Sequence, residues 1–275
     1  MTLDGIAVIT GAGSGIGRDC GLAYAAAGVA GVAFTDINLA NAQLACEESK
    51  SFATNPSYRA IALAVDVTSE TSMNAMISET VAAFGRIDYA VSSAGLGVQR
   101  PAEITATDIT EFEAFFNVNV KGSLLFVKAA SAVMKTQSPR HCLDRSGQHQ
   151  RDLGRGVIVN IASASSFVPT LGIVQYTSAK HALMGITKNA ALDLAPYSIR
   201  VNAVCPSWVA TPMMTRAFDG SPGLRDTVSK AVPMGRIALQ EEVSDVVVFL
   251  SGKGGSYVTG VGWIIDGGTT LQMHV

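Results

Sequence analysis

The chain alternates short apolar runs with longer helical patterns, and this alternation limits the folds open to it. Most of the runs are apolar throughout, without the polar residue at every second position that a half-exposed strand shows. Strands of this kind are buried on both faces, as in a parallel sheet that helices cover. The runs are residues 6–10, 32–35, 61–65, 89–92, 157–161, 200–204 and 262–265.

Helical patterns fill the intervals between these runs. They cover residues 16–28, 38–53, 70–84, 108–135, 175–194 and 241–251. Alternation of strands and helices predicts right-handed crossovers and a doubly wound sheet. We therefore expect an α/β fold, a single Rossmann-like domain over residues 1–275 with about seven parallel strands and helices on both faces. The expected caps are Thr68 for the third helix and Thr107–Asp108 for the fourth.

Composition excludes several classes of function. Hydrophobic residues make up 48% of the chain and charged residues 15%, with a formal net charge of −2. Without a basic stripe, we expect no nucleic-acid partner and no binding to a membrane. Apolar stretches are too short for a signal peptide or a membrane span. The four cysteines show no CxxC spacing, which predicts reduced thiols in a cytoplasmic protein.

One segment, at about 136–156, interrupts the alternation of strands and helices. It is polar, rich in arginine and longer than an ordinary connection, so we expect a surface insertion. His141, Cys142 and His149 lie within it and are candidate zinc ligands. Their spacing matches no common ligand set, and we therefore predict no metal site.

The stretch TGAGSGIG, from Thr10 to Gly17, joins the first expected strand to the first helix. Glycine lets a phosphate approach the backbone closely, and a helix N-terminus offers free amides to a pyrophosphate. The strict GxGxxG pattern fails because Ile16 stands where its last glycine would be. The pattern TGxxxGxG does fit, with Gly11, Gly15 and Gly17. We therefore expect a dinucleotide-binding turn.

Asp36 ends the second strand, nineteen residues after Gly17. An acidic residue at this distance accepts hydrogen bonds from the adenosine ribose and repels a 2′-phosphate. This favours NAD(H) over NADP(H). Two alternatives stay open: Asp36 caps the next helix, or Arg18 binds a phosphate.

The stretch YTSAK places Tyr176 and Lys180 four residues apart in an expected helix. Both side chains then lie on one face, one turn apart. An ammonium beside a phenol lowers the pKa of the phenol, which would make Tyr176 a general acid or base. An ordinary surface pair is the alternative.

Taken in order, these motifs resemble the short-chain dehydrogenase/reductase family over nearly the whole chain. The resemblance extends to DVT at Asp66, SSAG at Ser92, NVKG at Asn119, IVNIAS ending at Ser163, CPSWVATPM at Cys205 and DGG at Asp266. Two positions depart from the family pattern: Ser93 stands for asparagine, and Ser207 stands for glycine. The residues CPSWVATPM and the polar insertion resemble the corresponding segments of fungal members that act on secondary metabolites.

The resemblance implies an NAD site and a catalytic tetrad. The implied cofactor contacts are Gly11, Ser14, Gly15, Ile16, Gly17, Asp36, Asp66, Val67, Ser93, Ala94, Gly95, Tyr176, Lys180, Pro206, Val209 and Thr211. In the implied tetrad, Tyr176 exchanges a proton with the substrate oxygen and Ser163 holds that oxygen. Lys180 lowers the pKa of Tyr176, and Asn119 orders a water. Ser165 and Ser166 are alternatives to Ser163.

Substrate and assembly are also implied rather than derived. The segment at about 208–236 matches the substrate lid of the family, and its apolar residues suggest a hydrophobic secondary alcohol or ketone. Helices near 108–135 and 175–194 commonly pair between subunits in this family, which implies a homotetramer or homodimer. The rival functions are an NADPH-dependent ketone reductase of the same fold, a dinucleotide-binding scaffold without turnover, and a non-redox reaction.

Overall fold

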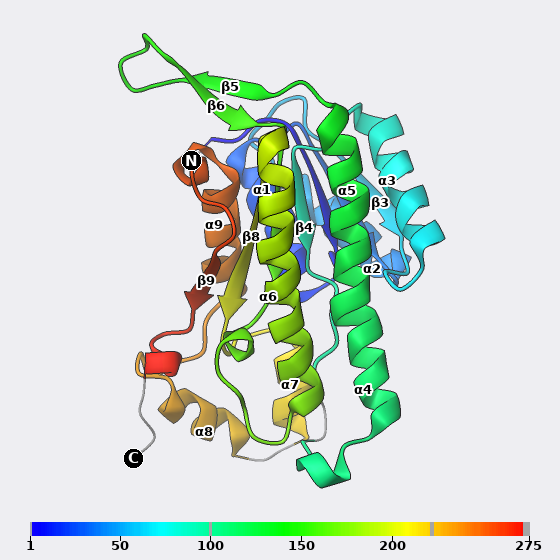
Figure 1. The fold of residues 1–275 in the computed structure, drawn as a ribbon, viewed down its shortest axis with the longest axis vertical. Helices are drawn as coiled ribbons and strands as arrows, with labels where there is room; N and C mark the ends of the chain where they lie inside the picture. Colours follow the sequence, from blue (N-terminus) through cyan, green and yellow to red (C-terminus); the bar gives the residue numbers. More distant parts are fainter. Residues whose placement is uncertain (1, 99–100, 221–222, 272–275) are drawn as a thin grey trace.

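A seven-stranded parallel sheet forms the centre of the molecule, in the order β3-β2-β1-β4-β7-β8-β9 (Figure 1). This computed structural model describes residues 2–98, 101–220 and 223–271. Residues 1 and 272–275 of the expected domain, and 221–222 of the expected lid, lie outside the described residues. The strands are β1 Ile6–Thr10, β2 Gly31–Asp36, β3 Arg59–Ala64, β4 Tyr89–Ser92, β7 Gly156–Ile161, β8 Ile199–Pro206 and β9 Gly262–Ile265.

Helices cover both faces of this sheet, and the predicted fold class is confirmed. The main helices are α1 Gly15–Ala27, α2 Leu39–Ser49, α3 Glu70–Phe84, α4 Ile109–Phe115, α5 Ser123–Thr136, α6 Val174–Leu194, α7 Pro212–Asp219, α8 Leu224–Ala231 and α9 Gln240–Ser251. One core lies between the sheet and α1, α2 and α9. A second lies between the sheet and α3, α5 and α6, of which α5 and α6 run side by side (Figure 1). No helix of the described ranges could cross a bilayer.

The helix expected over 108–135 is interrupted. After α4 the chain forms a π-helical segment, Phe116–Gly122, before α5 continues. A π-helical turn holds one more residue than an α-helical turn and often marks a functional position. Asp108 caps α4 as predicted, accepting from the Thr110 amide at 2.8 Å. The predicted cap of α3 is wrong: Ser69 caps it, because the Thr68 hydroxyl donates to Asp66 instead.

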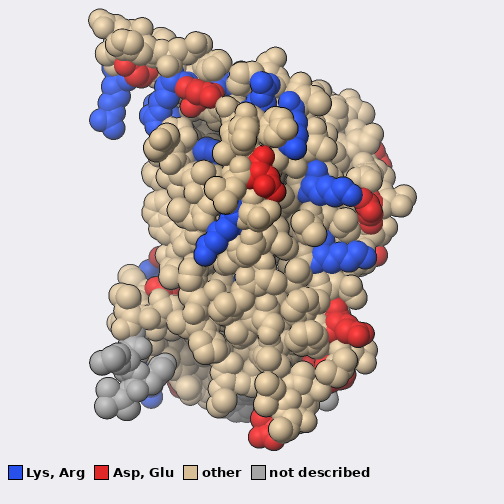
Figure 2. All heavy atoms as spheres, in the orientation of Figure 1, with Lys and Arg blue, Asp and Glu red and all other residues tan. Residues whose placement is uncertain are grey.

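The segment at 136–156 forms an antiparallel hairpin of β5 Arg140–Leu143 and β6 Gln150–Gly154. It projects from the end of the sheet where the strands begin (Figure 1, Figure 2). Gln137 anchors its base, since the carboxamide accepts from the Ile87 amide at 2.7 Å and donates to the Ile87 carbonyl at 2.8 Å. In the described part of the chain, no three His, Cys, Asp or Glu side chains lie together as a metal site.

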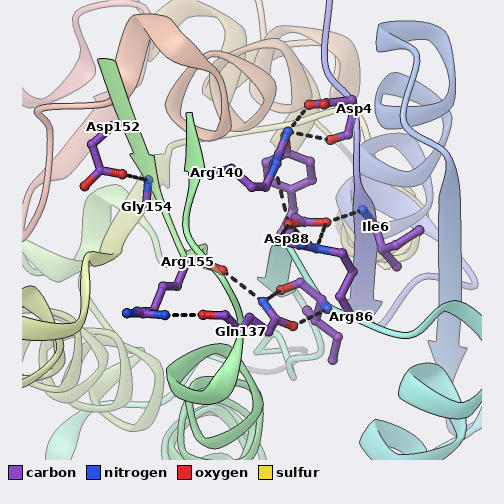
Figure 3. Close-up of polar contacts among 11 residues, drawn as sticks. Asp4, Ile6, Arg86, Asp88, Gln137, Arg140, Asp152, Gly154 and Arg155 are labelled. Carbon is purple, nitrogen blue, oxygen red and sulfur yellow. Dashed lines mark hydrogen bonds and ion pairs between the residues drawn. The ribbon is translucent and has the colours of Figure 1, made fainter. Parts of the chain in front are cut away.

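A buried carboxylate lies beneath this hairpin (Figure 3). Asp88 accepts hydrogen bonds of 2.9 Å from the Ile6 amide and from Nε of Arg86. The guanidinium of Arg140, at the start of β5, lies 3.6 Å from the same carboxylate and also bonds Asp4 at the surface. The hairpin is therefore tied to the sheet through a charge that water does not reach.

We expect Asp88→Ala to lower the free energy of unfolding by about 1–3 kcal/mol, because it leaves the buried Ile6 amide without its acceptor and removes the carboxylate shared by two partly buried guanidinium groups. Asp4→Ala removes a carboxylate from the same Arg140, but the side chain of Asp4 is 83% exposed. That control is expected to cost less than about 1 kcal/mol. Urea unfolding of the two variants measures the difference, and equal losses would contradict this account.

Candidate active site

The expected site residues all follow carboxyl ends of strands, or lie on helices that reach that edge of the sheet. Parallel strands end together, so the segments after β1, β2, β4, β7 and β8 meet at one edge. In Figure 1 this is the lower edge, opposite the hairpin, and α7 and α8 lie beside it. The strand order therefore gathers residues that are far apart in the sequence.

The glycine turn has the form that a pyrophosphate needs. A Cβ built on Gly17 would lie 2.3 Å from the carbonyl oxygen of Gly11, so only glycine lets α1 start this close to the turn. Gly15 has a φ of +58°, which also favours glycine. Within the described residues, Ser14 makes no capping hydrogen bond and the first turn of α1 holds no acidic residue. The amides of that turn are free to bind an anion, and the residues present fit a dinucleotide.

Asp36 ends β2 and supports the same turn. One carboxylate oxygen accepts from the Gly13 amide at 3.0 Å, and the other accepts from the Asn38 amide at 2.9 Å. The cap of α2 is Asn38, which accepts from the Asn41 amide, so the interpretation of Asp36 as the helix cap is wrong. Asp36 thus fixes the turn in addition to any contact with a cofactor.

Two other charged residues of the expected cofactor site have protein partners. Arg18 forms an ion pair with Glu48 of α2, which occupies the guanidinium that could have met a phosphate. Asp66 is exposed, and hydrogen bonds from the Thr68 hydroxyl and amide lower the pKa of its carboxyl. Its neighbour Val67 is buried.

The loop after β4 is held from two sides. The Thr10 hydroxyl accepts from the amides of Ser93 and Ala94, at 3.2 Å and 3.4 Å. On the other side, the Asn119 carboxamide accepts from the Leu96 amide at 2.7 Å and donates to the Leu96 carbonyl at 3.1 Å. Asn119 is buried in the π-helical segment, and its side chain clamps this loop. Gly95 lies against it, since a built Cβ would be 3.3 Å from Oδ1 of Asn119.

Tyr176, Ser163 and Lys180 come together beside this loop. The Ser163 side chain lies close enough to the Tyr176 phenol to lower its pKa, so of the three candidate serines it is the one placed at the phenol. Nζ of Lys180 lies 5.5 Å from the centroid of the Tyr176 ring and donates to the Ile161 carbonyl at 2.8 Å. Ser163 also accepts from the Ser165 amide at 3.1 Å, which fixes its side chain at the end of β7.

Burial dominates the protonation of this pair. Desolvation raises the pKa of the Tyr176 phenol, and the hydrogen bond from Ser163 only partly opposes this rise. Desolvation also lowers the pKa of Lys180 to about 8. The expectation that the ammonium holds the pKa of Tyr176 below its usual value is therefore wrong for this structure. The physical reason is that removing water disfavours both charged forms.

The segment after β8 closes the site from below. Val209 is buried, and Thr211 caps α7 by accepting from the Met214 amide at 3.3 Å. A Cβ built on Gly15 would lie 3.7 Å from the Thr211 side chain, so the start of α7 touches the glycine turn. Ser207, which stands for glycine, donates to the Asp266 carbonyl at 3.3 Å. Pro206, also among the expected contacts, is the last residue of β8.

Apolar side chains line the approaches to this edge. Met213 lies over the loop after β4, because a Cβ built on Gly97 would be 2.2 Å from its sulfur. Ile16 of the turn is partly buried and packs against the core beneath. Exposed apolar residues in the segments after β4, β7 and β8 include Leu96, Phe167, Val168, Leu171, Met213 and Met234.

Two neighbours of the tetrad were missed from the sequence. Phe115 meets the Tyr176 ring edge to face, with centroids 6.3 Å apart and planes at 83°. Cys205, at the end of β8, lies close enough to Lys180 for the ammonium to oppose the rise of the thiol pKa, which burial brings to about 12. Phe115 could have been found from its position four residues before Asn119, since residues one helical turn apart lie on the same face of a helix.

Proteins similar to this chain in sequence and in structure include dehydrogenases and reductases. A sequence profile described as enoyl-(acyl carrier protein) reductase matches residues 11–270. The chain is 52% identical to the short-chain dehydrogenase anuF of Penicillium roqueforti, over 100% of this chain and 99% of that protein. Levodione reductase superposes with a TM-score of 0.87 at 25% identity, over 99% of this chain and 100% of that one. The 3-ketoacyl-(acyl-carrier-protein) reductase of Brucella melitensis, complexed with NADH, superposes with a TM-score of 0.81 at 28% identity, covering 96% and 98% of the two chains.

Replacing Asn119 by alanine is expected to speed hydrogen exchange of the Leu96 amide by about tenfold, because that amide loses its acceptor. Ser123→Ala is the matched control, since the Ser123 hydroxyl donates to the backbone carbonyl of Asn119 and not to its carboxamide. Exchange at Leu96 measured by NMR tests the clamp. Unchanged protection in Asn119→Ala would show that the loop does not depend on it.

Proposed function

The chain belongs to the short-chain dehydrogenase/reductase family, and from this premise we propose that it is an NAD(H)-dependent oxidoreductase. It interconverts a hydrophobic secondary alcohol and its ketone through Ser163, Tyr176, Lys180 and Asn119. The observation that carries the proposal is the meeting of Ser163, Tyr176 and Lys180 at the edge of the sheet that also bears the glycine turn. A scaffold without turnover would not need a phenol and a buried ammonium at that place.

Each residue of the tetrad has a physical task in this reaction. When bound, the nicotinamide supplies the site that gives or receives hydride. Tyr176 exchanges a proton between its phenol oxygen and the substrate oxygen, and Ser163 donates a hydrogen bond to that oxygen as negative charge develops. Lys180 provides a cation beside the ring. Asn119 acts on the loop after β4, where it binds Leu96.

NAD(H) is the proposed cofactor, and two contacts support it. Asp36 stands at the end of β2 with its carboxylate on the glycine turn, where it would repel a 2′-phosphate. Arg18, the nearest cation in the turn, is paired with Glu48. The proposed cofactor contacts are those expected from the sequence, from Gly11 through Thr211. The Brucella relative that carries NADH has the same fold.

The apolar approaches support a hydrophobic substrate, and the similarity to a fungal short-chain dehydrogenase supports a role in secondary metabolism. We retain the cytoplasm as the proposed location. A homotetramer or homodimer through α5 and α6 is also proposed, because Leu124 and Leu192 on these helices are exposed.

Tyr176→Phe should abolish redox turnover, with a loss of about 10²–10⁴-fold, because no proton can be exchanged at the ring. Binding of NAD should be nearly unchanged, since the glycine turn stays intact and only one hydroxyl among the proposed cofactor contacts is lost. Formation of NADH with a panel of hydrophobic secondary alcohols measures turnover, and calorimetric titration measures binding.

The same titration separates the rival cofactors. Tighter binding of NADP than of NAD would contradict the role given to Asp36 and would favour the ketone reductase. Retained turnover in Tyr176→Phe would overturn the proposed mechanism. A wild-type protein that binds NAD but turns over no alcohol or ketone would favour the scaffold or a non-redox reaction.

The pH dependence follows from the lysine. Because burial lowers its pKa to about 8, Lys180 loses its proton as the pH rises through that value. Ketone reduction consumes a proton at the substrate oxygen, so its kcat/KM should fall as the pH rises through about 8. Alcohol oxidation needs the phenolate form of Tyr176, which loses the neighbouring positive charge over the same interval, so its kcat/KM should fall as well. Initial rates in both directions test this, and a flat profile through pH 8 would contradict it.

A further inference from the structure

Two side chains on one face of α4 contact two consecutive residues at the start of α6. Phe115, the last residue of α4, is 3% exposed and meets the Tyr176 ring edge to face, with centroids 6.3 Å apart. Four residues earlier, the Glu111 carboxylate accepts a hydrogen bond of 3.0 Å from Nε2 of the Gln175 side chain. Residues four apart lie on the same face of a helix, so α4 contacts Tyr176 and its neighbour from one side.

Gln175 is itself buried, whereas Glu111 is half-buried, so the hydrogen bond joins the interior to the edge of α4. A buried carboxamide without a hydrogen-bond partner costs free energy, so the bond to Glu111 is retained. It holds Gln175, and with it the adjacent backbone of Tyr176, at a fixed position relative to α4. The Phe115 contact then acts on the ring. A tyrosine ring turns about two single bonds, and its hydroxyl moves furthest when the ring turns.

We propose that Phe115 and Glu111 are positioning residues, which fix the Tyr176 ring so that its hydroxyl stays at Ser163. The catalytic meaning of this arrangement rests on the function proposed above. Glu111 holds the main chain through Gln175, and Phe115 holds the ring. Neither touches the reacting atoms, so both act through Tyr176.

The π-helical segment extends the same arrangement to the loop after β4. It begins directly after Phe115 and contains Asn119, which binds Leu96. The wider π turn changes the angle at which the following residues leave the helix. One continuous stretch of backbone therefore carries both Phe115, which contacts the Tyr176 ring, and Asn119, which binds the loop after β4.

Fluorine NMR tests the position of the ring without any substrate. The protein is labelled with 3-fluorotyrosine at its six tyrosines, and the signal lost in Tyr176→Phe identifies that ring. In Phe115→Leu, which keeps an apolar side chain but removes the ring, we expect the Tyr176 signal to shift and broaden. The matched control is Phe112→Leu on the same helix, whose ring stacks on Phe116 at 4.7 Å and not on Tyr176. Equal spectra for Phe115→Leu and the control would overturn the proposal.

Kinetics test the consequence, with 1-phenylethanol and 1-tetralol as probes and NAD as cofactor. Phe115→Leu should lower kcat by about tenfold, while KM and the Kd of NAD stay unchanged, because the proton acceptor is misplaced and binding is not. Glu111→Ala should have a similar effect. Glu111→Gln should restore the wild-type rate, because its amide oxygen still accepts from Gln175. A loss of rate in Glu111→Gln equal to that in Glu111→Ala would contradict positioning by this hydrogen bond.

Failure of the function and failure of this inference have different signatures. If the wild-type protein oxidises neither probe, the proposed function fails for that substrate class, and the fluorine spectra alone decide whether Phe115 holds the ring. If the wild-type protein is active and the Phe115→Leu spectrum and kcat match the Phe112→Leu control, the function stands and the inference is refuted. Should Phe115→Leu not fold, as judged by circular dichroism, the Tyr176 signal of Glu111→Ala compared with Glu111→Gln gives the same decision.

Discussion

The parallel pairing of β1 with both β2 and β4 is the constraint on which the site depends. From β1 the chain first moves toward β3, and it then returns to the other side of β1 to form β4. Connections at this reversal leave the sheet in opposite directions, which opens a crevice at the carboxyl ends of the two strands. The hydrogen bond from the Ser93 amide to the Thr10 hydroxyl joins the two connections at that point. The glycine turn and the loop that Asn119 clamps are thus fixed to each other before any ligand is considered.

Buried charge is treated differently at the two ends of the sheet. At the end where the strands begin, the Asp88 carboxylate is matched by Arg86 and by Arg140 of the hairpin (Figure 3). At the other end, the hydrogen-bond partner of the Lys180 ammonium is the carbonyl of Ile161. A buried cation that faces a neutral oxygen keeps a large desolvation cost, and this cost is what lowers its pKa. The first arrangement stabilises the fold, whereas the second keeps a group ready to titrate, which is typical of a functional site.

The sequence was most informative where a single residue type had one physical explanation. Strands β1 and β4 have the predicted bounds, because an uninterrupted apolar run has few alternatives to burial. Strand β9 also has the predicted bounds, although it is only partly buried at the edge of the sheet. Gly15 and Gly17 were placed in the turn by the same kind of argument.

The π-helical segment could not be predicted, because one extra residue in a turn hardly disturbs the apolar pattern of 108–135. The anchoring of the hairpin was also hidden, since Gln137 and Arg140 are polar and their partners are distant in sequence. The direction of the Tyr176 pKa was mistaken for a related reason, as spacing reveals a neighbouring lysine but not the loss of water around both groups.

The protonation of the Tyr176 and Lys180 pair explains how one arrangement can serve both directions of the proposed reaction. Burial favours the neutral phenol, so Tyr176 holds a proton that it can donate to a carbonyl oxygen. Removing a proton from an alcohol requires the opposite form, a phenolate, which a hydrogen bond from Ser163 and a nearby positive charge would both stabilise. Lys180 lies beside the ring and keeps its charge below a pH of about 8, so it can supply that stabilisation in the physiological range. In the proposed reaction the Tyr176 phenol is therefore the acid in one direction and its phenolate is the base in the other, with Lys180 as the neighbouring cation in both.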